Sequence, residues 1–207
     1  LLEISERGFD FLVPKKKADR FRRRWEFLQK FDKPLRYGVP PGDKFFQDFD
    51  AFYQGAHAMM KSPAIKDVMT LEKKDKERYG SSQLGDACAL ARNLVRAEAG
   101  TRFIMISQPG WDMHGSIYKK PGGLYKRANE LDTAFSALLA DLQDTKGPDG
   151  HSLLEKTLVV CMGEFGRTPG ELTVNTGRDH YPNAFTSVFS GGGTQGGRVL
   201  GATDELG

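Results

Sequence analysis

A short apolar run that breaks abruptly into glycine and charge constrains this chain more than any other feature. Residues 157–162 are β-branched and apolar, which is typical of a strand buried on both faces. The run ends in the sequence GEFGRTP, where two glycines and a proline allow a backbone that no regular element adopts. Glu164 and Arg167 lie inside that turn, and the sequence GRDHYP follows at residues 177–182. A rigid strand that ends in an open, charged loop is a common place for binding or catalysis.

A second apolar run lies upstream and is connected to the first through a helical pattern. Residues 103–107 predict a strand, and the glycine-flanked loop after it contains Asp112 and His114. Apolar residues then recur at helical spacing over residues 124–142, before the strand at 157–162 begins. This order predicts two parallel strands joined by a right-handed crossover. Because the carboxyl ends of parallel strands meet at one sheet edge, we expect the two charged loops to lie together.

The first hundred residues have the pattern of a helical segment. Apolar spacing and capping signals predict helices over residues 18–31, 44–61, 63–71 and 82–99. The charged residues 72–78 are expected to connect two of these helices, and residues 12–17 are expected to form an exposed connector. We interpret the aromatic-rich side of the second helix as a core face rather than a cofactor site, and His57 within it as structural.

Composition sets limits on the class of protein. The net charge is +3 and basic residues are mixed with acidic ones, which favours a solvated surface over a nucleic-acid site. No apolar run approaches the roughly 18 residues that a membrane span requires. Cys88 and Cys161 are interpreted as two buried thiols, and a disulfide between them is left open. We interpret the chain as a piece of a longer protein.

The charged loops contain residue types that bind metal ions. Asp112 and His114 can point at one ion when their loop curls, and Asp179 and His180 can do the same in a turn. Glu164 adds a third carboxylate. Carboxylate oxygen mixed with imidazole nitrogen suits Zn, Mn or Fe, and suits Ca or Mg alone less well. We expect the side-chain tips of Asp112, His114 and His180 to converge within a few ångströms, with Glu164 or Asp179 as further ligands.

A purely structural interpretation of the same residues stays open. Asp112 and Asp179 can cap turns, and Glu164 can form an ion pair with Arg167 that holds the turn together. His151 follows an Asp-Gly pair and is expected to be a surface loop residue.

Four motifs stand in a fixed order along the chain. They are GWDxHG at residues 110–115, TLVVxMGEFGRTP at 157–169, GRDHxPN at 177–183 and a glycine-rich ending at 191–204. With weaker helical matches near Ser62 and Arg78, they resemble the uncharacterised DUF1501 family over most of residues 45–207. Members of that family are typically exported, many by a twin-arginine signal. The resemblance therefore implies an exported protein, periplasmic or extracellular.

The DUF1501 family in turn resembles the alkaline phosphatase superfamily, which includes sulfatases and phosphoglycerate mutases. That resemblance implies two-metal phosphoryl or sulfuryl transfer with Asp and His ligands and a Ser or Thr nucleophile. Asp112 and His114 resemble the superfamily's first Asp and His ligands at a shorter spacing, and His180 resembles its late His ligand. Glu164 stands where the superfamily usually has Asp-His. We expect the family's first strand and the nucleophile to lie outside this chain.

These observations predict an α/β fold with a mostly parallel sheet of alkaline phosphatase-like type, incomplete in this chain. A helical segment over residues 1–100 is expected to pack on a core over residues 101–207. The predicted function is metal-dependent hydrolysis of a phosphate or sulfate ester, small or polymeric, with a divalent ion (Zn, Mn or Ca) as cofactor. Arg167 is expected to hold a substrate oxyanion. The alternative is a non-catalytic binding protein that keeps the fold and lacks the nucleophile.

Topology adds one further expectation. Asp179 and His180 precede the strand predicted over residues 184–190, whereas the other charged loops follow their strands. For His180 to reach the same sheet edge, that strand should run antiparallel to its neighbours. Residues 198–201 are expected to form a last short strand.

Overall fold

The computed structural model describes residues 2–4, 18–35, 38–40 and 42–205. Contacts divide the chain into two compact units, one of residues 7–70 and one of residues 1–6 with 71–207. The predicted boundary at residue 100 therefore differs from the division in the structure, because the helices after residue 71 pack with the strands. The connector expected at residues 12–17 lies outside the described residues.

The smaller unit is helical, as its periodicity predicts. It contains α1 (Ala18–Leu35), α2 (Lys44–Lys61) and α3 (Pro63–Val68). The Asp43 carboxylate accepts a hydrogen bond from a backbone N–H in the first turn of α2, and Ser62 caps α3 in the same way. His57 stacks on Trp25 with 4.0 Å between ring centroids, which fits its predicted structural role.

The aromatic side of α2 is not a core face, contrary to the prediction. Phe45 and Phe52 are 70% and 72% exposed, and α2 has no buried residue. The rings instead contact one another, as Phe49 and Tyr53 do with 4.4 Å between ring centroids. Amphipathic spacing identifies an apolar side of a helix, but other elements must cover that side before it becomes a core.

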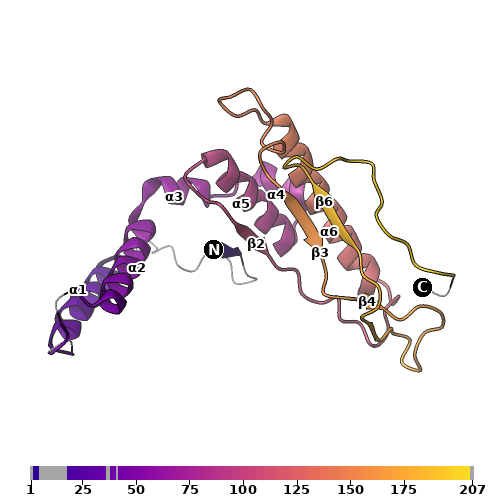
Figure 1. Cartoon of the computed structure of the whole chain (residues 1–207), viewed down its shortest axis with the longest axis horizontal. Helices are drawn as coiled ribbons and strands as arrows, with labels where there is room; N and C mark the ends of the chain where they lie inside the picture. The colour runs from indigo at the N-terminus through magenta and orange to yellow at the C-terminus, as the bar shows by residue number, and fades with distance from the viewer. Residues whose placement is uncertain (1, 5–17, 36–37, 41, 206–207) are drawn as a thin grey trace. The chain divides into compact units, whose positions relative to one another are not determined.

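The core of the larger unit lies where α4 (Lys73–Tyr79) and α5 (Gln83–Ala97) pack against α6 (Gly123–Asp144) (Figure 1). Its buried residues are Tyr79, Leu84, Cys88, Ala89, Ala134, Ala137, Leu138, Leu142 and Leu153. α4 was expected to be a connector, and a reciprocal capping box between Glu72 and Asp75 explains why so charged a segment forms a helix.

A buried network of charged groups ties these three helices together. Arg92 lies 2.7 Å from Asp75 and 3.0 Å from Asp141, and Asp141 also accepts hydrogen bonds from Arg78 and Tyr79. Burial by itself would raise the pKa of both carboxyl groups. The pKa of each is nevertheless lowered, for Asp75 by the Glu72 backbone N–H and then Arg92, and for Asp141 by the hydrogen bonds from Arg78, Tyr79 and Arg92. The network thus favours the ionised form of the buried Asp75 and the half-buried Asp141 next to the buried Arg92 guanidinium.

The described strands form three two-stranded sheets. β1 (Leu2–Ile4) pairs in parallel with β2 (Ile104–Ile106). β3 (Val159–Met162) pairs antiparallel with β6 (Ser187–Ser190), and β4 (Gly166–Arg167) pairs antiparallel with β5 (His180–Tyr181). The antiparallel direction predicted for the strand after His180 is therefore confirmed. β2 and β3 belong to different sheets, so the predicted parallel β-α-β sheet stays an expectation.

The prediction of a strand at residues 198–201 is wrong, because those residues have no regular secondary structure. Val199 and Leu200 are 91% and 93% exposed, so no neighbouring strand covers them. Cys88 and Cys161 are both free thiols, the first buried and the second half-buried, and burial raises the pKa of Cys88 to about 12.

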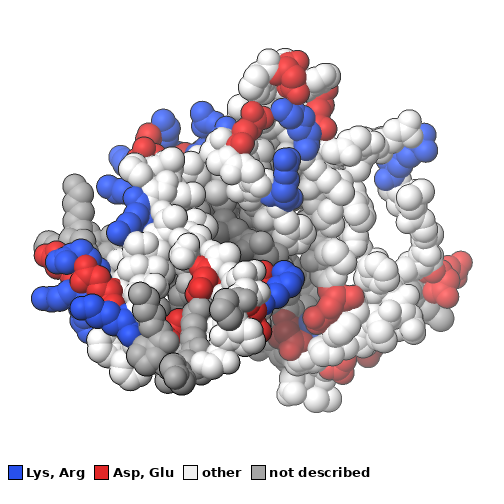
Figure 2. Space-filling model, turned by 60° about the vertical axis from the view of Figure 1, so that its left-hand side comes forward, with Lys and Arg blue, Asp and Glu red and all other residues white. Residues whose placement is uncertain are grey.

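Figure 2 shows Lys and Arg side chains intermixed with Asp and Glu on the visible face. Several charged side chains of the described helices form ion pairs one helical turn apart, such as Lys44 with Asp48 and Lys73 with Glu77. None of the described helices has the length and apolar character needed to cross a membrane.

Candidate metal centre

Two segments distant in the chain come together beyond the ends of β2 and β3 (Figure 1). The loop after β2 contacts the segment between β3 and β6 through a β-bridge between Gly115 and Thr176. The backbone of Arg178 donates a hydrogen bond to the Met113 carbonyl at 3.1 Å. A Cβ on Gly177 would lie 2.0 Å from the His114 carbonyl carbon, so the close approach of the two segments requires glycine there.

The short β4–β5 ladder sets the direction of two site residues. Arg167 and His180 are directly opposite each other in this antiparallel pair. Opposite residues of an antiparallel pair present their side chains on the same face. This pairing brings both side chains to Asp112, which arrives on the loop after β2.

The Asp112 carboxylate is the hub of the resulting cluster. Its Oδ1 lies 2.8 Å from His114 Nε2, 3.0 Å from His180 Nε2 and 2.8 Å from Arg167 Nη1. The two Nε2 atoms are 3.1 Å apart. Ligand atoms of Asp112, His114 and His180 all lie within 4.8 Å of one another. The predicted convergence of these three side chains is therefore confirmed.

The other ring nitrogen of His114 has a different partner. Its Nδ1 lies 3.0 Å from Oδ1 of Asp179. Asp179 thus contacts the imidazole from the side opposite to Asp112 and His180. When the neutral ring carries its proton on Nδ1, Nε2 presents a lone pair to the other two residues.

The electrostatics of the cluster favour an ionised Asp112. The hydrogen bond with His180 and the ion pair with Arg167 lower the pKa of Asp112 to about 2, from an ordinary value of 3.8. The Arg167 Nη1 atom is buried, and its contact within the cluster is the 2.8 Å ion pair with Asp112. A permanently charged guanidinium therefore lies next to the cluster.

The site is open to solvent. The side chains of Asp112 and His114 are 62% and 46% exposed, and that of Arg167 is 23% exposed. A ligand can reach the cluster without any movement of a covering segment.

The family described as "Protein of unknown function (DUF1501)" matches residues 10–207. The chain belongs to the DUF1501 family. No curated protein and no solved structure matches it significantly. The match includes every residue of the cluster, as well as the loops that carry them.

Within this DUF1501 chain, the predicted site residues divide into two groups. Asp112, His114 and His180 meet at one point, and Arg167 and Asp179 contact that group. Glu164 is exposed and lies outside the group of converging ligand atoms. The structural interpretation paired Arg167 with Glu164, whereas its ion pair is with Asp112.

Three neighbours of the cluster were missed by the sequence reasoning. The Phe165 ring lies 4.4 Å from the His180 ring, measured between centroids. Thr168 and Arg178 hold the two loop segments together, because Arg178 donates to the Thr168 and Gly170 carbonyls. All three lie inside the GEFGRTP or GRDHYP motif, and this position in the sequence could have identified them as neighbours of the site.

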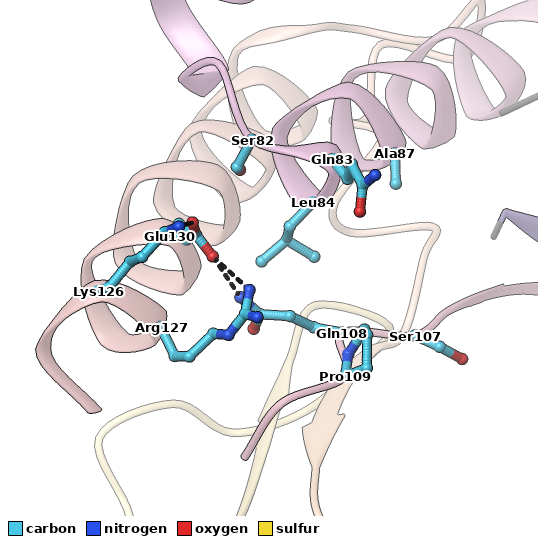
Figure 3. Close-up of a pocket in the computed structure, with 10 residues that line it drawn as sticks. All are labelled: Ser82, Gln83, Leu84, Ala87, Ser107, Gln108, Pro109, Lys126, Arg127 and Glu130. Carbon is cyan, nitrogen blue, oxygen red and sulfur yellow. Dashed lines mark hydrogen bonds and ion pairs between the residues drawn. The ribbon is translucent and has the colours of Figure 1, made fainter. Parts of the chain in front are cut away.

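A shallow hollow of about 290 Å³ lies at the carboxyl end of β2 (Figure 3). Figure 3 shows Arg127 paired with Glu130, at 3.0 Å, and Gln108 beside the same carboxylate at 3.4 Å. The charged side chains Arg127 and Glu130 that line this hollow are already paired, and the hollow is small for a ligand pocket. None of the clustered Asp and His residues lines it, so we place the candidate site at the cluster instead.

Proposed function

We propose that this protein binds a divalent metal ion through Asp112, His114 and His180 and hydrolyses phosphate or sulfate esters there. The observation that carries the proposal is the convergence of one carboxylate oxygen and two imidazole nitrogens, 2.8–3.1 Å apart. If these residues only capped turns, there would be no reason for their three side chains to converge on one point.

The donor set fits a transition-metal ion. Oxygen and nitrogen atoms about 3 Å apart can share one ion, given metal–ligand bonds of about 2.0–2.2 Å. With the His114 proton on Nδ1, its Nε2 lone pair faces the Asp112 oxygen at 2.8 Å. Two acceptors at that distance repel unless a proton or a cation lies between them. Three protein ligands also leave coordination positions for water or substrate, as catalytic sites do.

Arg167 supports the choice of an oxyanion substrate. Its guanidinium is held near the cluster by Asp112, and its side chain stays 23% exposed. A planar, permanently charged fork matches the geometry of phosphate and sulfate oxygens. Arg167 would therefore bind and orient the ester group beside the three ligands.

The metal, when bound, would act as a Lewis acid on the ester and lower the pKa of a bound water. The chain's own residues would orient that water and the ester. Among the described residues, no serine or threonine hydroxyl hydrogen-bonds to the side chains of Asp112, His114 or His180. Hydrolysis with water as the nucleophile needs no such hydroxyl, and this is the route we propose.

The lack of a serine or threonine hydroxyl hydrogen-bonded to these ligands, among the described residues, favours a second candidate, a non-catalytic binding protein. A protein that has the metal ligands and Arg167 but lacks a nucleophile would bind an oxyanion-bearing ligand without cleaving it. The two candidates share the metal site and differ in turnover.

The proposal extends to fold and location. We propose that the chain is part of an alkaline phosphatase-like α/β domain and acts outside the cytoplasm. Support for both comes from the resemblance of the DUF1501 motifs to that superfamily and from the export typical of the family. Fractionation of cells that express the full-length protein tests the location directly.

The function is tested on purified full-length protein. Elemental analysis gives the bound metal, and chelated protein is then reloaded with Zn²⁺, Mn²⁺ or Ca²⁺ and assayed with p-nitrophenyl phosphate and p-nitrophenyl sulfate. We expect metal-dependent turnover that His180→Ala abolishes and that Glu171→Gln, an exposed acid on a nearby loop, leaves unchanged. Metal binding without turnover on any ester identifies the binding protein. Absence of metal binding contradicts both candidates.

Arg167→Lys tests the substrate role. Loss of the planar fork should raise KM for the ester while metal affinity stays within about threefold, because the lysine ammonium keeps the charge but not the bidentate geometry. A lower melting temperature with unchanged hydrolysis would assign Arg167 to structure instead.

A further inference from the structure

We infer that Asp179 is a positioning residue for His114 and not a metal ligand. The inference rests on the proposed metal site and refines it. It departs from the sequence-based expectation, in which Asp179 supplied a further ligand oxygen beside Asp112, His114 and His180.

The geometry separates the two carboxylates that contact His114. Asp112 lies 2.8 Å from Nε2, the nitrogen that faces His180, whereas Asp179 lies 3.0 Å from Nδ1. The two nitrogens lie on opposite sides of the imidazole ring, so Asp179 contacts the side away from the point where the three ligand atoms meet. Asp179 also lies outside the group whose ligand atoms converge.

The two carboxylates that contact His114 favour different proton positions, since Asp112 can accept an N–H from Nε2 and Asp179 can accept one from Nδ1. An ionised carboxylate only accepts hydrogen bonds, so Asp179 favours the form of His114 with its proton on Nδ1. That form leaves the Nε2 lone pair free and directed at Asp112 and His180. A carboxylate that receives the second N–H of a metal-binding histidine fixes the ring orientation and raises its basicity.

The backbone around Asp179 is held firmly enough to maintain this contact. The Asp179 N–H donates to Thr168 Oγ1 at 3.1 Å, and the Asp179 carbonyl accepts from the Thr168 N–H at 2.9 Å. The preceding residue, Arg178, donates its backbone N–H to the Met113 carbonyl, next to His114. Its guanidinium also binds the carbonyls of Thr168 and Gly170. Asp179 is thus fixed to the loop of His114 and to the loop of Arg167.

The test combines a metal-independent and a metal-dependent measurement on the full chain. Long-range ¹H–¹⁵N NMR correlations, recorded on chelated protein at pH 8.5, report which nitrogen of His114 carries the proton. Competition with a chromophoric chelator gives the affinity for Zn²⁺ and Co²⁺. Both are measured for wild type, Asp179→Ala, Asp179→Asn and the matched control Glu171→Gln, and circular dichroism verifies that each variant is folded.

We expect a larger share of the His114 proton on Nδ1 in the wild type and in Asp179→Asn, whose amide oxygen can still accept the N–H, than in Asp179→Ala, where Asp112 still accepts at Nε2. Asp179→Ala should lose this preference and bind metal about 10- to 100-fold more weakly. Asp179→Asn should regain part of the affinity, and Glu171→Gln should match the wild type.

Two other results separate the inference from the proposed function. If Asp179→Ala keeps wild-type metal affinity or keeps the wild-type distribution of the proton between Nδ1 and Nε2, the positioning role is wrong and the metal site stands. If the wild type binds no metal while Asp179→Ala still changes the proton position, Asp179 does position His114 and the proposed function is wrong.

Discussion

At the scale of single residues, one oxygen atom organises the site. Oδ1 of Asp112 contacts His114, His180 and Arg167. All three partners carry or can carry positive charge, which keeps the carboxylate ionised although it is largely exposed. The lowered pKa of Asp112 follows from these contacts, because burial acts in the opposite direction.

The first prediction concerns the titration of Asp112. The pKa of Asp112 in the folded protein is about 2, against an ordinary value of 3.8. The contacts of its ionised carboxylate therefore stabilise the loop at pH values above 3.8, and this stabilisation is lost as the pH falls toward 2. The side-chain carboxyl ¹³C shift of metal-free protein should therefore titrate with a midpoint near pH 2. Arg167→Gln should move this midpoint upward, toward the ordinary value. An ordinary midpoint in the wild type would contradict the cluster.

The second prediction concerns the backbone contact that joins the two loops. Gly177→Ala would place a Cβ 2.0 Å from the His114 carbonyl carbon, which forces the loops apart. We expect a loss of about 1–3 kcal/mol in the free energy of unfolding, together with weaker metal binding. Gly163→Ala is the matched control, because nothing lies within 4 Å of its added Cβ. Urea unfolding and chelator competition measure the two effects, and equal results for both variants would contradict the prediction.

At the scale of elements, short strands position the site residues and longer helices form the core. β4 and β5 have two residues each, yet their pairing places Arg167 opposite His180. α4, α5 and α6 supply the core and share the ion network around Arg92. The loop after β2 starts from this core, since Ile106 packs against it.

The third prediction concerns that network. Arg92→Met removes the only guanidinium that contacts both Asp75 and Asp141 among the described residues, which leaves the buried Asp75 without its ion pair while Asp141 keeps Arg78. We expect a loss of about 3–5 kcal/mol in the free energy of unfolding. Arg96→Met, an exposed arginine on the same helix, should change stability by less than about 0.5 kcal/mol. Urea unfolding of both variants checks this, and similar midpoints would show that the network contributes little.

At the scale of the whole molecule, the chain divides into a helical unit and a unit that contains the whole candidate site. Residues 7–70 form the first, and every residue of the cluster belongs to the second. Metal binding should therefore stabilise one unit directly. A ligand present at about 100 times its Kd stabilises the folded state that binds it by about 2.7 kcal/mol.

The fourth prediction follows from this division. Hydrogen exchange followed by mass spectrometry, with and without Zn²⁺, should show slower exchange in the peptides that contain residues 110–116 and 166–181. Peptides from α2 should exchange at the same rate in both conditions, because none of the cluster residues belongs to their unit. Equal protection of α2 and of the cluster would contradict the prediction, and His180→Ala should abolish the effect of Zn²⁺.

The sequence by itself determined the local elements and the chemistry of the loops. Apolar spacing predicted α2 at its observed bounds and α6 within a few residues, because helix formation depends on residues three and four apart. Apolar runs predicted β2 and β3, and the glycine-flanked acid–imidazole pairs identified Asp112, His114 and His180 as candidates. The antiparallel direction of β6 followed from requiring His180 to reach the same loops.

Only the tertiary structure decided how the loop residues face one another. The pairing of β4 with β5, the contact of Asp179 with Nδ1 and the position of Glu164 outside the cluster depend on irregular backbone and on contacts more than ten residues apart. Side-chain periodicity carries no information about such segments, because their directions follow from pairing register and from close approaches such as that of Gly177 to His114. The exposure of the aromatic side of α2 was undetermined for a related reason, since spacing along one helix does not specify what covers it.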